Sequence, residues 1–274
     1  MFKTLLRPHV TEVYPFGTRL SFSIRQKLLQ GIVSTGIKNV EIGSLNTLKD
    51  PHCNQLVKDS SDYLKRNLAQ EVSIHCSSTK DLNHFLQLRK SLEPSSLAVN
   101  TVILNLYAPV AFNAHDQATA FKNFQDIGMM AKLNHLKVKA QVHFAFVCPY
   151  EGQVSPTLVA YLTQRFKLQV GANTVVFTDL TGHCKPQNIT DLLSEVLPIY
   201  PASNIGIQFS DSLLLKDNLK VCFQNNVYRF QTSVVGHRGI VSTGKMTYIL
   251  RNEGFDMNID DWLVSLPDEL KELK

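Results

Sequence analysis

Short apolar runs alternate with segments of helical period along almost the whole chain. Runs rich in valine, isoleucine, leucine and phenylalanine predict strands, and apolar residues recurring every three or four positions predict helices. The predicted strands cover residues 12–14, 39–42, 72–76, 101–106, 138–146, 174–178, 205–209 and 227–235. The predicted helices cover residues 24–32, 54–68, 80–92, 116–133, 156–168, 187–197, 212–225, 245–253 and 259–266.

This alternation continues without a break in composition, which predicts an α/β protein with a single (β/α)₈ TIM barrel. The barrel is expected to span residues 1–266, followed by a polar tail at residues 267–274. An open doubly wound sheet is the alternative. No glycine-rich dinucleotide fingerprint follows any predicted strand, which argues against that alternative.

Composition and charge exclude several classes of function. The chain has 274 residues, of which 44% are hydrophobic and 19% charged, and its net charge is +5. Its basic residues are scattered, so no nucleic-acid partner is expected. No apolar run is long enough for a membrane span, and the first residues do not resemble a signal peptide. The five widely spaced cysteines suggest reduced thiols and a cytoplasmic protein, with an organellar matrix as the alternative.

In a parallel barrel the chemistry lies at the carboxyl ends of the strands. The segments that follow the predicted strands are residues 15–18, 41–44, 76–78, 106–108, 143–151, 178–182, 208–211 and 235–239. Gln141, His143 and Ala145 alternate along the fifth strand and therefore share one face. If that face lines the barrel, His143 points toward the site.

The most specific motif is the turn Cys148-Pro149-Tyr150-Glu151-Gly152, followed by Ser155-Pro156 and later by Thr178-Asp179-Leu180-Thr181-Gly182. This arrangement resembles 3-hydroxy-3-methylglutaryl-CoA lyase, in which a C-P-Y-E-G turn, a serine-proline helix start and a D-T-I-G segment follow strands five and six. Further matches are residues 12–15, 40–44, 206–211, 247–250 and 254. The resemblance covers nearly the whole chain.

The resemblance implies a TIM barrel and a carbon–carbon bond cleavage assisted by a divalent metal such as Mg²⁺ or Mn²⁺. In that family hydroxymethylglutaryl-CoA yields acetyl-CoA and acetoacetate. The metal is held by an aspartate after strand one, two histidines on strand seven and an asparagine near strand eight. An arginine and a loop cysteine assist the reaction. Dimers are common in the family, so a homodimer is an option for this chain.

The chain departs from this pattern at most of those positions. Phe16 and Gly17 replace the arginine–aspartate pair, Gln208 and Ser210 replace the two histidines, and Ile240 stands near the asparagine position. Neutral oxygens are weak ligands for a hard divalent ion, so no cofactor is expected. The prediction is a degenerate, non-catalytic binding or scaffold relative. The alternative is an active lyase-like enzyme with a rebuilt site, which would use Mg²⁺ or Mn²⁺ if the old site works.

Three residues are the candidates for catalysis: Asp179, Glu41 and His143. Asp179 could be a surviving acid or base, or it could cap the next turn. Glu41 could act in catalysis or form a structural ion pair, for which Arg19 is the candidate partner. His143 could be a new base or a hydrogen-bonded core residue.

A second group is expected to contact the ligand, for which an acyl-CoA or a carboxylate is the candidate. This group consists of Arg19, Cys148, Tyr150, Gln208, His237 and Arg238. His237 and Arg238 lie in the short loop after the eighth strand and could meet a phosphate or a carboxylate. The thiol of Cys148 has no sequence neighbour that would activate it as a nucleophile.

Overall fold

The computed structural model describes residues 9–13, 22–46, 52–67, 69–91, 98–109, 116–233, 239–257 and 259. Its main sheet is a closed barrel of parallel strands, in the order β1-β10-β9-β8-β5-β4-β3-β2. These strands are β1 (His9–Val13), β2 (Asn39–Ser44), β3 (Glu71–His75), β4 (Thr101–Tyr107), β5 (Lys137–His143), β8 (Thr174–Thr178), β9 (Ile205–Gln208) and β10 (Arg229–Thr232). The predicted TIM barrel is confirmed.

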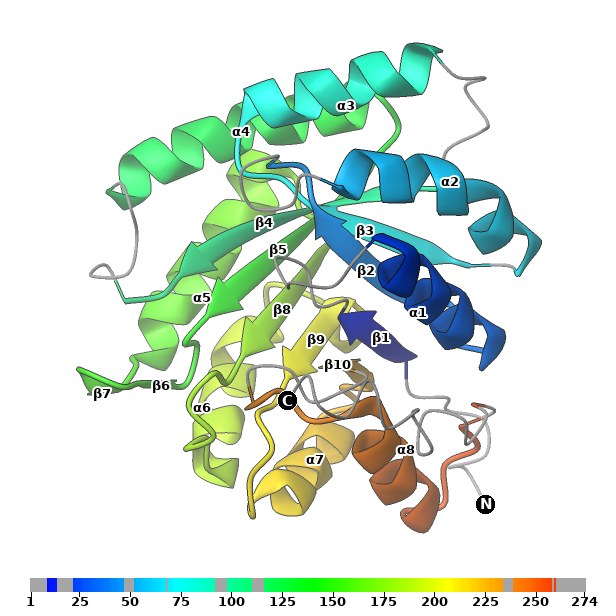
Figure 1. Ribbon diagram of the computed structural model, residues 1–274. Helices are drawn as coiled ribbons and strands as arrows, with labels where there is room; N and C mark the ends of the chain where they lie inside the picture. Colours follow the sequence, from blue (N-terminus) through cyan, green and yellow to red (C-terminus); the bar gives the residue numbers. More distant parts are fainter. Residues whose placement is uncertain are drawn as a thin grey trace.

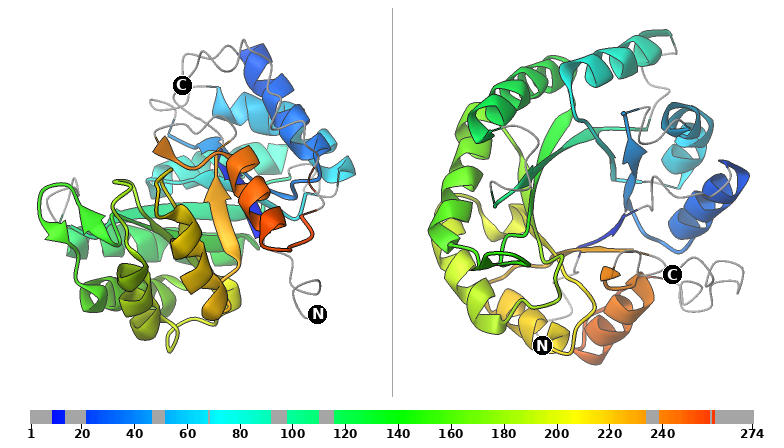
Figure 2. Two further views of the ribbon diagram at one scale, coloured as in Figure 1. Left: turned by 90° about the horizontal axis from the view of Figure 1, so that it is seen from below. Right: turned by 60° about the vertical axis from the view of Figure 1, so that its left-hand side comes forward.

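Helices surround the barrel on its outside (Figure 2). They are α1 (Phe22–Ser34), α2 (Cys53–Arg66), α3 (Thr79–Ser91), α4 (Gln117–Leu133), α5 (Pro156–Arg165), α6 (Pro186–Val196), α7 (Leu215–Gln224) and α8 (Thr243–Asn252). A π-helical turn, η2 (Phe166–Val170), extends α5, and a 3₁₀ turn, η3 (Ala202–Asn204), precedes β9. The apolar core lies between strands and helices. Within it, Phe121 and Phe124 of α4 pack on Phe166 with ring centroids 4.9 and 5.5 Å apart.

Two helices, α4 and α5, begin with a side-chain cap. The Ser155 hydroxyl accepts a hydrogen bond from the N–H of Leu158, and Pro156 is the first residue of α5. The Asp116 carboxylate caps α4 by accepting from the N–H of Thr119 at 2.9 Å. The predicted helix at 259–266 and the tail at 267–274 lie outside the described residues, apart from Ile259.

The last strand, β10, is shorter than the predicted strand at 227–235, and the end of β5 also differs from the expected element. β5 ends at His143 rather than at 146, because Phe144 has a φ of 51° and an extended strand cannot continue through that left-handed conformation. The following turn contains a small antiparallel hairpin of β6 (Val147–Cys148) and β7 (Gly152–Gln153). In Figure 1 this hairpin projects from the side toward which the arrowheads of β4, β5 and β8 point, which is the C-terminal face of the barrel.

Candidate functional site in the barrel lumen

Polar side chains from most strands of the barrel meet inside it. The alternation along each strand directs every second residue inward. The inward-facing residues that carry the candidate chemistry are Glu41 (β2), His75 (β3), Asn105 (β4), Gln141 and His143 (β5), Thr178 (β8), Gln208 (β9) and Gln231 (β10). Most of them are buried, whereas Asn105 and His143 are half-buried near the C-terminal mouth.

One hydrogen-bonded chain crosses five strands. Glu41 Oε1 contacts His75 Nε2, and His75 Nδ1 lies 2.6 Å from Asn105 Nδ2. Asn105 Oδ1 lies 3.2 Å from His143 Nε2. His143 Nδ1 lies 3.1 Å from the hydroxyl oxygen of Thr178. The chain therefore runs from the buried carboxylate of Glu41 to the half-buried imidazole at the mouth.

A second set of bonds joins the glutamines. The Gln141 amide donates to the side-chain oxygens of Gln208 at 3.0 Å and of Gln231 at 2.9 Å. The Gln231 amide in turn donates to Glu41 Oε2 at 3.4 Å. Gln141 Oε1 is buried and has no hydrogen-bond partner among the described residues. The two sets share Glu41, so the lumen holds one connected polar network.

Burial and neighbouring groups set the charge states at the two ends of the chain. Burial alone would raise the pKa of Glu41, but His75, Lys139 and His143 more than offset this and hold that pKa below its usual range. Burial lowers the pKa of His143 to about 4; the nearby His75 lowers it further and Glu41 opposes the shift. At neutral pH the chain therefore has an anionic Glu41 and a neutral His143.

The carboxylate of Asp179 closes the turn after β8. Its Oδ1 accepts hydrogen bonds from the N–H of Thr181 at 3.1 Å, from the Thr181 hydroxyl at 3.0 Å and from the N–H of Gly182 at 3.0 Å. Its Oδ2 is buried and has no hydrogen-bond partner among the described residues. This geometry is that of an Asx turn, in which the side chain satisfies the following backbone. It supports the capping alternative for Asp179.

We expect Asp179→Ala to lower the free energy of unfolding by roughly 2 to 3 kcal/mol, because it leaves three donors without their acceptor. Asp179→Asn keeps an oxygen at the Oδ1 position and is expected to cost about 1 kcal/mol. Urea unfolding of both variants measures the difference. Equal stability of the two variants would contradict the capping role. A stable Asp179→Asn variant that loses ligand binding would show that the charge itself is used.

The described residues do not fit the divalent metal of the resembled family. Gln208 Oε1 is occupied by the Gln141 amide, and the Ser210 hydroxyl donates to the Asp179 carbonyl at 2.6 Å. Glu41 is engaged by His75 and Gln231. No group of three or more His, Cys, Asp or Glu side chains in the described part of the chain could hold a metal ion. A hard cation would therefore find one engaged carboxylate and two engaged neutral donors.

The expected ligand-contacting residues do not all lie in the same place. Gln208 lies in the lumen network, where its side-chain oxygen accepts from the Gln141 amide. Cys148 is buried, and its sulfur accepts hydrogen bonds from the N–H groups of Tyr150 and Glu151, both at 3.4 Å, so the thiol stabilises the turn. Tyr150 is exposed on the hairpin. The three basic candidates, Arg19, His237 and Arg238, lie outside the described residues.

Sequence reasoning missed His75 and Asn105. The partner of Glu41 is His75 of the neighbouring strand, whereas Arg19 was the candidate and lies outside the described residues. The available signal was alternation: His75 follows Ser73 by two residues, and Asn105 interrupts the apolar run of β4. All five cysteines are buried thiols, and reduced thiols were what their spacing suggested. No described helix is long and apolar enough to cross a membrane.

Comparison with known sequences finds low but consistent similarity. No family model matches the chain. It is 27% identical over 151 residues to the cytoplasmic 3-hydroxy-3-methylglutaryl-CoA lyase of Danio rerio, covering 52% of this chain and 45% of that protein. It is 22% identical over 248 residues to the mitochondrial hydroxymethylglutaryl-CoA lyase of Arabidopsis thaliana, covering 87% of this chain and 52% of that protein. The chain thus spans about half the length of the curated relatives it matches.

Comparison with solved structures identifies the same fold. An HMG-CoA lyase from Acenitobacter baumannii, solved in complex with coenzyme A and 3-methylmalate, superimposes with a TM-score of 0.83. The match covers 97% of this chain and 91% of that one, at 19% sequence identity. The barrel and its order of strands and helices are therefore shared, while most side chains differ.

Proposed function

We propose that this chain, which is a diverged member of the 3-hydroxy-3-methylglutaryl-CoA lyase-like family, no longer performs metal-assisted carbon–carbon cleavage and acts as a non-catalytic binding or scaffold protein. One observation carries the proposal. Gln208 and Ser210, which stand where the family has its two histidines, are hydrogen-bonded to the protein itself. A hard cation needs anionic oxygens that are available to it, and this arrangement offers it almost none.

The ligand we propose is an acyl-CoA or a small carboxylate, bound at the C-terminal mouth of the barrel. A structural relative was solved with coenzyme A and 3-methylmalate. The sequence supplies Arg19, His237 and Arg238 in the segments after the first and last strands, and such cations suit phosphate and carboxylate groups. We place the protein in the cytoplasm. An organellar matrix is the alternative, since its relatives include cytoplasmic and mitochondrial enzymes.

An activity assay tests the proposal. Purified protein is incubated with hydroxymethylglutaryl-CoA and Mg²⁺ or Mn²⁺, alongside an active lyase of the family, and acetoacetate is measured. We expect a rate at least about a thousandfold below the active lyase, because losing members of a cooperating catalytic set removes most of the rate. Acetoacetate formation at an ordinary enzymatic rate would overturn the proposal. Calorimetric titration with coenzyme A and with 3-methylmalate tests the binding role separately.

A rebuilt active enzyme is the second candidate, and the position of His143 favours it. This imidazole is half-buried at the mouth, is neutral at pH 7 and is connected to an anionic Glu41 through two intervening side chains. Such an arrangement suits a general base acting on an acyl-CoA or a hydroxy acid. Turnover of such a substrate that is lost in His143→Gln would support this candidate over the non-catalytic one.

A further inference from the structure

The donors and acceptors of the lumen chain can be assigned one after another. An ionised carboxylate only accepts hydrogen bonds, so Glu41 requires a hydrogen on His75 Nε2. On the other side of the same ring, His75 Nδ1 lies 2.6 Å from the amide nitrogen of Asn105, which can only donate. His75 Nδ1 must therefore be the acceptor, and the ring is neutral with its hydrogen on Nε2.

The same logic passes through Asn105 to His143. Since the amide nitrogen of Asn105 faces His75, its oxygen faces His143 Nε2 at 3.2 Å and requires a hydrogen there. His143 then has a bare Nδ1, which accepts from the Thr178 hydroxyl at 3.1 Å. Every contact in the chain is satisfied by one arrangement of hydrogens, with all donors oriented toward Glu41.

We propose that Glu41, His75 and Asn105 form a positioning relay, which holds His143 as the neutral tautomer protonated on Nε2. His143 Nδ1 is then a hydrogen-bond acceptor near the mouth, shared with Thr178. The part of a ligand that meets it is a hydroxyl or an N–H group, which replaces the Thr178 hydroxyl as the donor to Nδ1, and a carboxylate or phosphate would bind elsewhere at the mouth. This assignment of the ligand group rests on the proposed binding function, whereas the tautomer does not.

Other groups around His143 leave the relay in place. Lys139 precedes His143 by four residues on the same face of β5, and its ammonium is paired with Glu71. The ring of Tyr107, from β4, lies with its centroid 4.9 Å from that of His143. The imidazole of His75 and the carboxylate of Glu41 are the two titratable groups that shift the pKa of His143. Glu41 is thus the charged end of the hydrogen-bonded chain to which His143 belongs.

The test is nitrogen-15 NMR of the full chain labelled at histidine. The ring nitrogen shifts distinguish the two neutral tautomers from the imidazolium, and signals are assigned by their loss in His75→Gln and His143→Gln. The wild type is expected to show neutral rings protonated on Nε2 at both positions at pH 7. A His143 ring protonated on Nδ1 would overturn the proposal.

Asn105→Asp probes the connection. A carboxylate at 105 only accepts, so it forces His75 to donate from both nitrogens and become an imidazolium. We expect the ring nitrogen shifts of His75 at pH 7 to change from those of a neutral ring to those of an imidazolium, with His143 still protonated on Nε2. Asn204→Asp is the matched control, because the amide of this half-exposed residue donates to the backbone carbonyl of Asn173 and not to a histidine, and the change is expected to alter neither ring. An unchanged His75 in Asn105→Asp would refute the relay.

Thr178→Val is the second variant, for the case in which Asn105→Asp does not fold. It removes the hydroxyl that faces His143 Nδ1 and leaves the rest of the relay intact. If the relay sets the tautomer, His143 stays protonated on Nε2; a switch to Nδ1 would assign the control to Thr178 and overturn the proposal. The NMR readout needs neither ligand nor turnover. Lyase activity in the assay above would therefore refute the proposed function and leave this inference standing.

Discussion

Glu71→Ala is expected to lower the free energy of unfolding by about 3 to 5 kcal/mol, because it leaves a buried ammonium without its counter-ion. Lys139 is only 1% exposed, and Glu71 is its ion-pair partner. Arg229 lies 3.6 Å from the other carboxylate oxygen. Burial would raise the pKa of Glu71, but Lys139 and Arg229 more than offset this and hold that pKa below its usual range.

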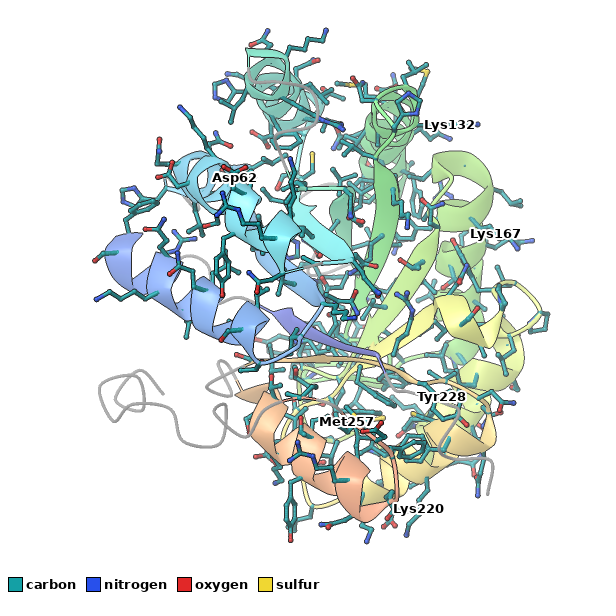
Figure 3. All side chains as sticks on the ribbon, turned by 90° about the vertical axis from the view of Figure 1, so that its right-hand side faces the viewer. Asp62, Lys132, Lys167, Lys220, Tyr228 and Met257 are labelled. Carbon is teal, nitrogen blue, oxygen red and sulfur yellow. The ribbon has the colours of Figure 1, made fainter. Side chains whose placement is uncertain are left out.

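This ion cluster lies at the N-terminal face of the barrel, opposite the candidate site. Figure 3 looks at that face, where Tyr228 directly precedes β10 and the cluster's Arg229, and Lys132 and Lys167 lie near helix ends. A small cavity of about 10 Å³ borders Lys139, Arg229 and Gln231, which is space for about one water molecule. Charged side chains therefore fill the N-terminal end of the lumen.

Urea unfolding of three variants checks this prediction. Glu71→Ala/Lys139→Met removes both charges and is expected to be more stable than Glu71→Ala, because a buried ion pair can be replaced by apolar groups at little net cost. Asp217→Ala breaks the exposed pair of Asp217 and Lys220 and is expected to be much less destabilising than Glu71→Ala, because solvent screens an exposed pair. A Glu71→Ala variant no less stable than Asp217→Ala would show that Lys139 finds solvent or another partner.

The barrel was predictable from the sequence because its strands and helices differ in period. The strand at 174–178 was predicted with its observed bounds, since apolar β-branched residues there are followed by turn chemistry. The end of β5 was not predicted, because Phe144 adopts a left-handed backbone conformation that is uncommon for phenylalanine. The helix at 156–168 was predicted two residues short of its end at Val170. Its π-helical turn could not be recognised, because the residues of that turn continue the ordinary helical pattern.

The sequence predicted which residues of one strand share a face, but it did not predict which residues of neighbouring strands contact each other. Alternation placed Gln141 and His143 on one face, and that face lines the lumen. The contact of Glu41 with His75 depends on how β2 and β3 align, and their register shifts between Glu41 and Ser44. A single sequence does not encode such a register in any local pattern, so the partner of Glu41 could not be chosen among the polar residues of the neighbouring strands.

His143 is expected to make the protein less stable in acid by roughly 3 kcal/mol between pH 7 and pH 4, relative to a His143→Gln variant. Its pKa is about 4 in the folded protein and about 6.5 in the unfolded chain. Between these values the unfolded chain binds a proton that the folded protein does not, so stability falls as pH falls. A shift of one pKa unit corresponds to about 1.4 kcal/mol, which sets the size of the effect.

Urea unfolding of the wild type and of His143→Gln at pH 7, 6, 5 and 4 measures this loss of stability in acid. The difference in the free energy of unfolding between wild type and His143→Gln should change steadily below about pH 6.5, the reference pKa, and level off near pH 4. Glu41 and His75 belong to the same network, so a second comparison with His75→Gln separates their contribution. A constant difference from pH 7 to pH 4 would mean that His143 accepts a proton in the folded state. The Thr178 hydroxyl would then have to accept from a protonated Nδ1 instead of donating to it, and the imidazole at the mouth would be a donor rather than an acceptor.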